Sequence, residues 1–394
     1  MSIRDSILSS AGRANALVLL VTVFVLLVGA EIALRITYHP ENLGTVIRYD
    51  DLLGWSLVPN AMLISNDTGR GLHYRMDINS IGLREDEVDL PKPKGRKRVL
   101  ILGDSIAFGS GVQGNERFSD HLKGELPGDV DIVNAGVPGW GTDQELLFYE
   151  RDLRRLEADI VVLEFTANND VVNNELRGPL IEDGTKPRFR CNDGVLTLEP
   201  PNRPAVVATT AKARVKSVLR KSRLLLFVKR RLEMRHYKQH AREDPSLAHA
   251  GYEADRHLSH WSVYDTRGGV AIETAWSVTE CIFAQLAHDC REDSVRLIVF
   301  AFPLKIEVDV PWRDDLIQRT QTDPQYLDYM RPYRRMEAIC AREGIEFVYP
   351  LDAFRHALAE GPLYFEHDSH PNAHAHAVAA GALRDVLVPA VSRR

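Results

Sequence analysis

Five short apolar runs, rich in β-branched residues, constrain the fold of this 394-residue chain more than any other feature of its sequence. Each run is continuous rather than alternating, as expected for strands that are buried on both faces of a sheet. Helical patterns separate the runs, and one of them opens with a capping box from Thr142 to Glu145. The repeated order of strand and helix predicts a parallel α/β sandwich. The predicted strands are residues 98–102, 130–134, 159–165, 295–302 and 345–349.

An uncharged apolar segment at residues 14–30 predicts a membrane-spanning helix. Its roughly 17 residues reach about 25 Å at about 1.5 Å each, and residues 32–36 can extend the helix. Arg4 and Arg13 precede the segment and Arg35 follows it, so the positive-inside rule favours an N-terminus in the cytoplasm and a chain body outside. We expect an uncleaved, single-pass anchor in the cytoplasmic membrane. A signal peptide cleaved near the small residues at the end of the segment is the alternative, and it exports the same body.

The chain is predicted to have three parts. Residues 1–38 form a cytoplasmic tail and the anchor, residues 39–97 form a lead-in segment rich in Gly, Pro and Asn, and residues 98–390 form the α/β domain. Between the third and fourth strands, a helical insertion at about 171–269 is far longer than an ordinary connection. Its ten Lys and Arg residues between positions 212 and 235 predict a solvated helix face, which is the commoner case, or a helix that rests on an anionic bilayer or binds an acidic polymer.

Composition excludes some classes of function. Charged residues make up 26% of the chain and the formal net charge is −6, which gives no reason to expect nucleic-acid binding. The four cysteines show no CxxC spacing typical of a zinc or redox site. They either form one or two disulfides in an oxidising compartment or stay as small buried apolar side chains; Cys281 and Cys290 lie too far apart along one straight helix to pair with each other. The other two are Cys191 and Cys340.

Residues with chemical roles follow four of the five predicted strands. Ser105 ends a Gly-Asp-Ser sequence after the first strand, and Gly139 lies in a glycine-rich loop after the second. Asn169 follows the third strand, and Asp368 and His370 follow the fifth. Because open α/β sheets hold their sites at the carboxyl ends of the strands, we expect these residues to share one crevice. A hydroxyl nucleophile, backbone and amide donors, and an acid–base pair are the groups that acyl transfer requires.

These four blocks, in this order and each after a strand, resemble the SGNH or GDSL hydrolase family from about Arg98 to Ala380, excluding the insertion. The resemblance implies a three-layer α/β/α sandwich whose five parallel strands are ordered 2-1-3-4-5. It also implies a triad in which His370 removes the proton of Ser105 and Asp368 orients His370. The oxyanion hole would consist of the backbone N–H groups of Ser105 and Gly139 and the side chain of Asn169.

Two positions depart from the family pattern. Asp368 and His370 are separated by one residue rather than the commoner two, and Glu366 is an alternative partner for the histidine. Asn168 stands where the family usually has a glycine, so that either Asn168 or Asn169 can face the site. We favour Asn169 because an aspartate follows it.

A cluster of histidines near the C-terminus offers a rival interpretation. His370 and His374 have the i, i+4 spacing of a helical metal site, and His367 and His376 lie nearby. Nothing else in the sequence supplies an obvious third ligand, so we expect no metal and no cofactor. We expect His374 and His376 to lie on an exposed helix face.

The residues and the resemblance together predict a bacterial serine esterase or acylhydrolase. It would remove O-acyl groups, with O-acetyl favoured, from a glycan or lipid in the periplasm or outside the cell. The expected partners are this acylated substrate and the membrane, through the N-terminal helix. Two alternatives stay open: a polysaccharide O-acyltransferase, since triad residues do not reveal which hydroxyl receives the acyl group, and a non-catalytic glycan-binding or assembly protein.

Overall fold

The structure is a computed structural model that describes residues 10–37, 45–67, 72–176, 185–202, 222–240, 258–320, 322–366 and 368–392. The chain forms two compact units. The larger unit comprises Glu41–Pro204 and His240–Arg394, and the smaller comprises Met1–Pro40 and Ala205–Gln239.

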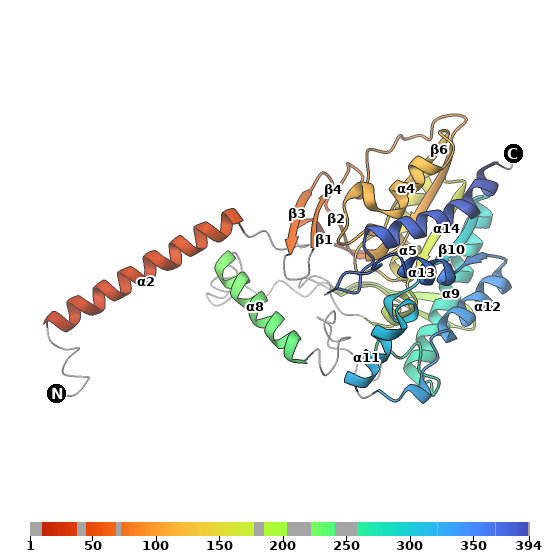
Figure 1. Ribbon diagram of the computed structural model, residues 1–394. Helices are drawn as coiled ribbons and strands as arrows, with labels where there is room; N and C mark the ends of the chain where they lie inside the picture. Colours follow the sequence, from red (N-terminus) through yellow and green to blue (C-terminus); the bar gives the residue numbers. More distant parts are fainter. Residues whose placement is uncertain are drawn as a thin grey trace. The chain divides into compact units, whose positions relative to one another are not determined.

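A five-stranded parallel sheet forms the centre of the larger unit (Figure 1). Its spatial order is β6-β5-β7-β10-β11, which is the expected order 2-1-3-4-5 and confirms the predicted fold class. Each predicted strand matches an observed strand, with ends that differ by at most one residue. The strands are β5 (Lys97–Leu102), β6 (Val130–Asn134), β7 (Ile160–Phe165), β10 (Arg296–Ala301) and β11 (Glu346–Val348).

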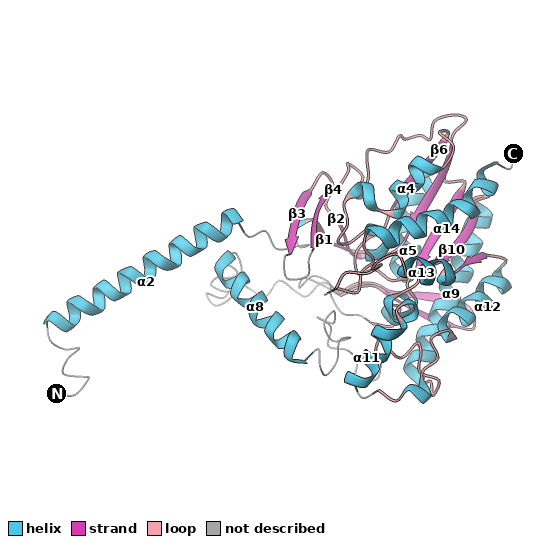
Figure 2. Cartoon of the chain, in the orientation of Figure 1, coloured by secondary structure: helices cyan, strands magenta, loops and turns pink. Residues whose placement is uncertain are grey.

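Helices cover both faces of this sheet (Figure 2). One layer contains α4 (Phe118–Glu125), α13 (Leu351–Leu358) and α14 (Ala373–Ser392). The other contains α5 (Thr142–Phe148), α6 (Ala167–Asn173), α9 (Val270–Glu292) and α12 (Arg331–Glu343). Because both faces are covered, every residue of β7 is buried, and this explains the continuous apolar runs in the sequence. The remaining short elements are α3 (Ser105–Phe108), α10 (Lys305–Val308), α11 (Val310–Thr320), the 3₁₀ turns Gly114–Glu116, Arg154–Leu156 and Pro324–Tyr326, and a π turn at Tyr149–Leu153.

The lead-in segment and the insertion both contain β-hairpins that the sequence pattern did not predict. The lead-in forms β1 (Ile47–Asp50) with β2 (Gly54–Leu57) and β3 (Met62–Asp67) with β4 (Leu72–Asp77). The insertion, predicted to be helical, forms the hairpin of β8 (Arg188–Asn192) and β9 (Val195–Glu199) as well as the helix α8 (Arg223–His240).

One disulfide joins this insertion hairpin to the α/β body. Cys191 in β8 pairs with Cys281 in α9, with their Cα atoms 6.3 Å apart. Cys290 and Cys340 are free and buried. Of the two cysteines in α9, Cys281 is therefore in the disulfide and Cys290 is not, since they lie too far apart along the helix to pair with each other.

The smaller unit contains α2 (Ser10–Thr37) and α8. From Arg13 to Thr37, α2 is long and apolar enough to cross a membrane, and none of its most apolar stretch is buried against the protein. A signal sequence near an N-terminus meets the same criteria.

Candidate active site

Ser105 follows the carboxyl end of β5, which lies between β6 and β7 in the sheet, and is the first residue of the short helix α3. The carboxylate of Asp104 caps this helix by accepting a hydrogen bond from the N–H of Ile106 at 2.7 Å. Gly103 is required for the close packing of this turn, since a Cβ at that position would lie 2.7 Å from a carboxylate oxygen of Glu164 in β7. The turn presents Ser105 at the sheet edge where β5 and β7 end.

His370 and Asp368 meet Ser105 at this edge. The Nε2 atom of His370 lies 2.9 Å from Oγ of Ser105, and its Nδ1 contacts the buried carboxylate of Asp368. The backbone N–H of His370 also donates to Asp368, at 2.9 Å. Because the carboxylate holds the proton on Nδ1, Nε2 is left as an acceptor for the hydroxyl proton of Ser105. A single intervening residue is therefore enough for the carboxylate to reach the imidazole.

The loop that carries His370 is tied to the end of β10. Phe365 donates its backbone N–H to the carbonyl of His370 at 3.1 Å, and Tyr364 forms a β-bridge with Pro371. The hydroxyl of Tyr364 donates to the carbonyl of Pro303 at 2.6 Å. These contacts position the histidine although the chain there is not in a strand or a helix.

Two backbone N–H groups near Ser105 have no hydrogen-bond acceptor among the residues that the structure describes: those of Ser105 itself and of Gly139. Gly139 has φ of 78°, in the left-handed region that favours glycine. Its loop is joined to the nucleophile turn by a 3.0 Å hydrogen bond from Val137 N–H to the carbonyl of Gly103. The site therefore offers two unpaired donors close to the serine.

The amide of Asn169, in α6, is oriented by two partners. Its Nδ2 donates to the carboxylate of Asp104, and its Oδ1 accepts from Nδ2 of Asn173 at 2.8 Å. An amide nitrogen carries two hydrogens, so one remains for a ligand. The structure thus brings Asn169, next to Asp104, to the serine turn.

Four buried carboxyl groups lie behind the serine, and the sequence analysis missed them as a group. They belong to Asp104, Glu145 in α5, Glu164 in β7 and Asp170 in α6. Burial raises the pKa of each carboxyl, and the charges of the other members raise the pKa of Glu145, Glu164 and Asp170 further. Neither carboxyl oxygen of Glu145 has a hydrogen-bond partner among the described residues.

Lys186 supplies positive charge to this region from the segment that leads into β8. Its ammonium group lies 2.7 Å from the carboxylate of Asp143 and donates to the carbonyl of Asn173. Burial lowers the pKa of Lys186 and raises that of Asp143. The insertion therefore contacts the same helix that carries Asn169.

The lead-in segment also supports the site. The indole N–H of Trp55 donates to the carbonyl of Pro138, next to Gly139, at 3.1 Å, and the indole of Trp140 donates back to the carbonyl of Trp55 at 3.2 Å. The buried guanidinium of Arg84 donates to the carbonyls of Phe108 and Gly109 at the end of α3, and burial lowers its pKa to about 9. The sequence contains one signal that Trp55 and Arg84 support the site: both are large side chains in a lead-in segment otherwise rich in turn residues.

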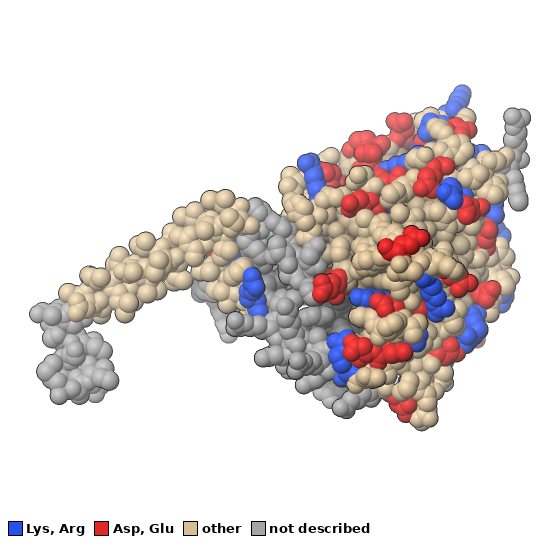
Figure 3. Space-filling view, viewed as in Figure 1, with Lys and Arg blue, Asp and Glu red and all other residues tan. Residues whose placement is uncertain are grey.

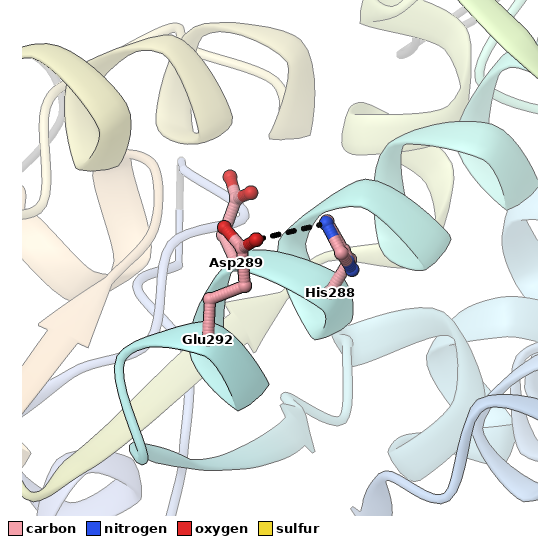
Figure 4. A group of neighbouring side chains, drawn as sticks. All are labelled: His288, Asp289 and Glu292. Carbon is pink, nitrogen blue, oxygen red and sulfur yellow. Dashed lines mark ion pairs between the residues drawn. The ribbon is translucent and has the colours of Figure 1, made fainter.

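The expectation that His376 lies on an exposed face is wrong. Its ring is fully buried and stacks on Phe118, and burial and nearby positive charges lower its pKa to about 3. His374 is half-buried, and His367 lies outside the described residues. Within the described chain, the group that could hold a metal ion is instead His288, Asp289 and Glu292 (Figure 4).

This second group lies in the last turn of α9, which leads into the amino end of β10, and His288 and Glu292 are exposed. It includes none of the candidate catalytic residues. The i, i+4 pair formed by His370 and His374 is not part of it.

The parallel sheet, with a serine, a histidine and a carboxylate meeting at its carboxyl edge, is the arrangement of a hydrolase that acts on ester bonds. Residues 101–244 match the model of the GDSL-like lipase/acylhydrolase family, a range that includes Ser105, Gly139 and Asn169. Over these residues the chain is similar to the GDSL-like hydrolases. No curated protein matches the sequence.

Several solved structures are similar to the chain. A GDSL-like lipase from Bacteroides thetaiotaomicron is 13% identical, with 76% of this chain and 93% of that chain covered and a TM-score of 0.36. A catalytic mutant of the acetylxylan esterase Axe2 from Geobacillus stearothermophilus is 14% identical, with 74% and 94% covered and a TM-score of 0.37. TesA is 12% identical, with 74% and 99% covered and a TM-score of 0.36.

Proposed function

We propose that this chain is a serine esterase that removes O-acyl groups, with O-acetyl favoured, from a glycan or lipid outside the cytoplasm. The observation that carries the proposal is the 2.9 Å contact between Ser105 Oγ and His370 Nε2, with Asp368 on the other ring nitrogen. In this arrangement the imidazole can take the serine proton, and the carboxylate stabilises the imidazolium that forms.

The reaction would proceed in two acyl transfers. Ser105 Oγ attacks the ester carbonyl as its proton moves to His370, and the oxyanion accepts hydrogen bonds from the N–H groups of Ser105 and Gly139 and from Nδ2 of Asn169. The C–O bond to the alcohol then breaks, and His370 donates its proton to the leaving oxygen. Water, deprotonated by His370, next attacks the acyl-serine, releases the carboxylic acid and restores Ser105. Each oxyanion donor is worth about 3 kcal/mol of transition-state stabilisation.

The location outside the cytoplasm is supported by two independent features. The helix α2 has the length and hydropathy of a membrane span or an export signal. The disulfide between Cys191 and Cys281 is of the kind that persists in oxidising compartments. Anchored by α2 with its N-terminus in the cytoplasm, the larger unit would face the periplasm or the exterior.

The serine mechanism can be tested with a short-chain chromogenic ester and the full-length protein in detergent. We expect Ser105→Ala to abolish hydrolysis and to prevent acylation of the protein by the ester, measured by mass spectrometry. Ser277→Ala, which changes an exposed serine of α9, should retain both. Equal hydrolysis by the Ser105 variant and the parent would sink the proposal, and acyl release that requires a sugar hydroxyl would indicate the transferase instead.

The identity of the orienting carboxylate can be tested separately. Asp368→Asn should lower kcat by about 10⁴-fold, because an amide favours the wrong imidazole tautomer. Glu366→Gln should leave kcat close to that of the parent, since Asp368 is the carboxylate in contact with Nδ1. The reverse ranking of the two variants would assign the role to Glu366.

A further inference from the structure

The start of α8 is bound to α2 within the smaller unit. The carboxylate of Glu31 accepts hydrogen bonds from the backbone N–H groups of Arg223 at 3.0 Å and Leu224 at 2.9 Å, and from the hydroxyl of Ser222 at 2.8 Å. Arg35 also donates to Glu31, at 2.8 Å. The first N–H groups of a helix have no partner within it, and negative charge is favourable there. Glu31 therefore caps α8 from another helix.

This contact sets the depth of α8 relative to the span. Glu31 lies six residues before Thr37, where α2 ends, which places it about 9 Å from that end at about 1.5 Å per residue. In Figure 1, α8 runs across the direction of α2 rather than alongside it. A helix that starts at this depth and crosses a spanning helix lies in the interfacial layer, where amphipathic helices bury their apolar face by about 5–10 Å.

The surface of α8 has the pattern of an interfacial helix. Leu225, Val228 and Leu232 lie three and four positions apart, so they share one face, and they are 44%, 44% and 58% exposed. Lys229 and Arg231 are exposed on either side of this row. The visible face of α2 is almost entirely uncharged (Figure 3), so both helices of the unit present apolar side chains at their surface. Contiguous exposed apolar surface of this kind marks an interaction site.

The charge of α8 is strongly positive, although the whole chain carries a net charge of −6. Only one acidic residue, Glu233, occurs in the helix. Positive charge is complementary to the phosphate headgroups of anionic lipids, and each Lys or Arg near such a surface strengthens binding about fivefold. The basic residues of α8 are Arg223, Lys229, Arg230, Arg231, Arg235 and Lys238.

We propose that α8 is an in-plane anchor on the outer leaflet of the bilayer that α2 crosses. Its apolar row enters the interface, and its exposed residues Lys229 and Arg231 bind anionic phospholipid headgroups. The inference goes beyond the esterase function and does not depend on it, because the smaller unit contains none of the candidate catalytic residues.

A fluorescent label on Leu232→Cys of the full-length protein tests this inference. The label is selective, since Cys290 and Cys340 are buried and the other cysteines form a disulfide. The protein is placed in vesicles of phosphatidylcholine alone or with about 30% phosphatidylglycerol, a strongly anionic surface. In the anionic vesicles we expect a blue-shifted emission that is quenched by lipids carrying a nitroxide in the upper acyl chain.

Two variants separate charge from position. Lys229→Gln with Arg231→Gln should weaken docking about fivefold per charge removed, whereas Arg267→Gln with Arg334→Gln, which removes the same charge from the larger unit, should not. Glu31→Ala should release the label into water. The protein should still stay in the vesicles during extraction with alkaline carbonate, because α2 still spans the membrane.

Three outcomes would overturn the inference. The label can report water in both kinds of vesicle, or it can be quenched equally in both, which would exclude recognition of anionic headgroups. Displacement of the label from anionic vesicles by polygalacturonate would assign the basic surface to an acidic polymer.

Discussion

The side chain of Asn169 is held at both of its polar atoms, and its neighbour Asn168 is not. Asp104 accepts from Nδ2 of Asn169, and Asn173 donates to Oδ1. The side chain of Asn168 forms no hydrogen bond with any residue in the described ranges. A donor whose orientation is set before the substrate binds is what stabilisation of an oxyanion requires.

We therefore expect Asn169→Ala to lower kcat by about 10²- to 10³-fold with little change in KM. Asn168→Ala is the matched control and should retain kcat. Both constants are measured on a short-chain ester, with thermal melting to show that each variant is folded. Equal losses of kcat in Asn169→Ala and Asn168→Ala would show that Asn169 is not the oxyanion donor.

At the scale of elements, the segment around the hairpin β8–β9 links the insertion to three helices of one layer of the sandwich. The disulfide joins β8 to α9, and Lys186, just before β8, contacts Asp143 in α5 and the carbonyl of Asn173 in α6. Segments before and after the nucleophile in sequence thus both contact the active-site edge. The insertion contacts α6, and the β1–β2 hairpin contacts the loop that carries Gly139 through Trp55.

The disulfide should contribute strongly to stability because it closes a long loop. Cys191 and Cys281 are 90 positions apart, and closing a loop of that length restricts the unfolded chain by about 4 to 5 kcal/mol at most. We expect a reductant to lower the midpoint of urea unfolding of the parent protein. Cys191→Ser should show the lowered midpoint without reductant and no further change on its addition. A parent protein that is insensitive to reductant would contradict the expectation.

At the scale of the whole molecule, the buried carboxyl groups link folding to pH. The pKa of Glu145 is well above its ordinary value of 4.5 because the group is buried near other carboxyl groups. The folded protein therefore holds this proton more tightly than the unfolded chain does. The stability that this provides is complete below the unfolded pKa and is lost as pH rises through the folded pKa.

Glu145→Gln should consequently stabilise the protein more at pH 8 than at pH 5, because the amide never has to ionise in the core. The free energy of unfolding at the two pH values, from urea titrations, gives the comparison. Glu360→Gln, at an exposed position, is the control. If Glu145→Gln changed the free energy of unfolding equally at both pH values, the pKa of Glu145 would not differ between the folded and unfolded states.

The sequence alone predicted the five strands within one residue at each end, the fold class and the ester-hydrolysing class. Strands buried on both faces must be continuous apolar runs, and a parallel sheet gathers the residues after its strands at one edge. The first rule acts on residues that are close together in the chain, and the second needs only the positions of the strands along it. The alternation in β4, where Leu72, Tyr74 and Met76 are buried and their neighbours are exposed, was also readable but lay in a segment that resembled a loop.

Only the tertiary structure decided the contacts between distant groups that do not follow from the positions of the strands. His376 is buried because its face of α14 packs on Phe118 in α4, and no feature of its own helix indicates that partner. Cys191 pairs with Cys281 because the insertion hairpin folds back on α9. The carboxyl cluster gathers side chains from α5, β7, α6 and the turn before α3, and Glu31 meets α8 across almost two hundred residues. Local periodicity determines which face of an element is apolar, whereas the partner of that face depends on how the whole chain packs.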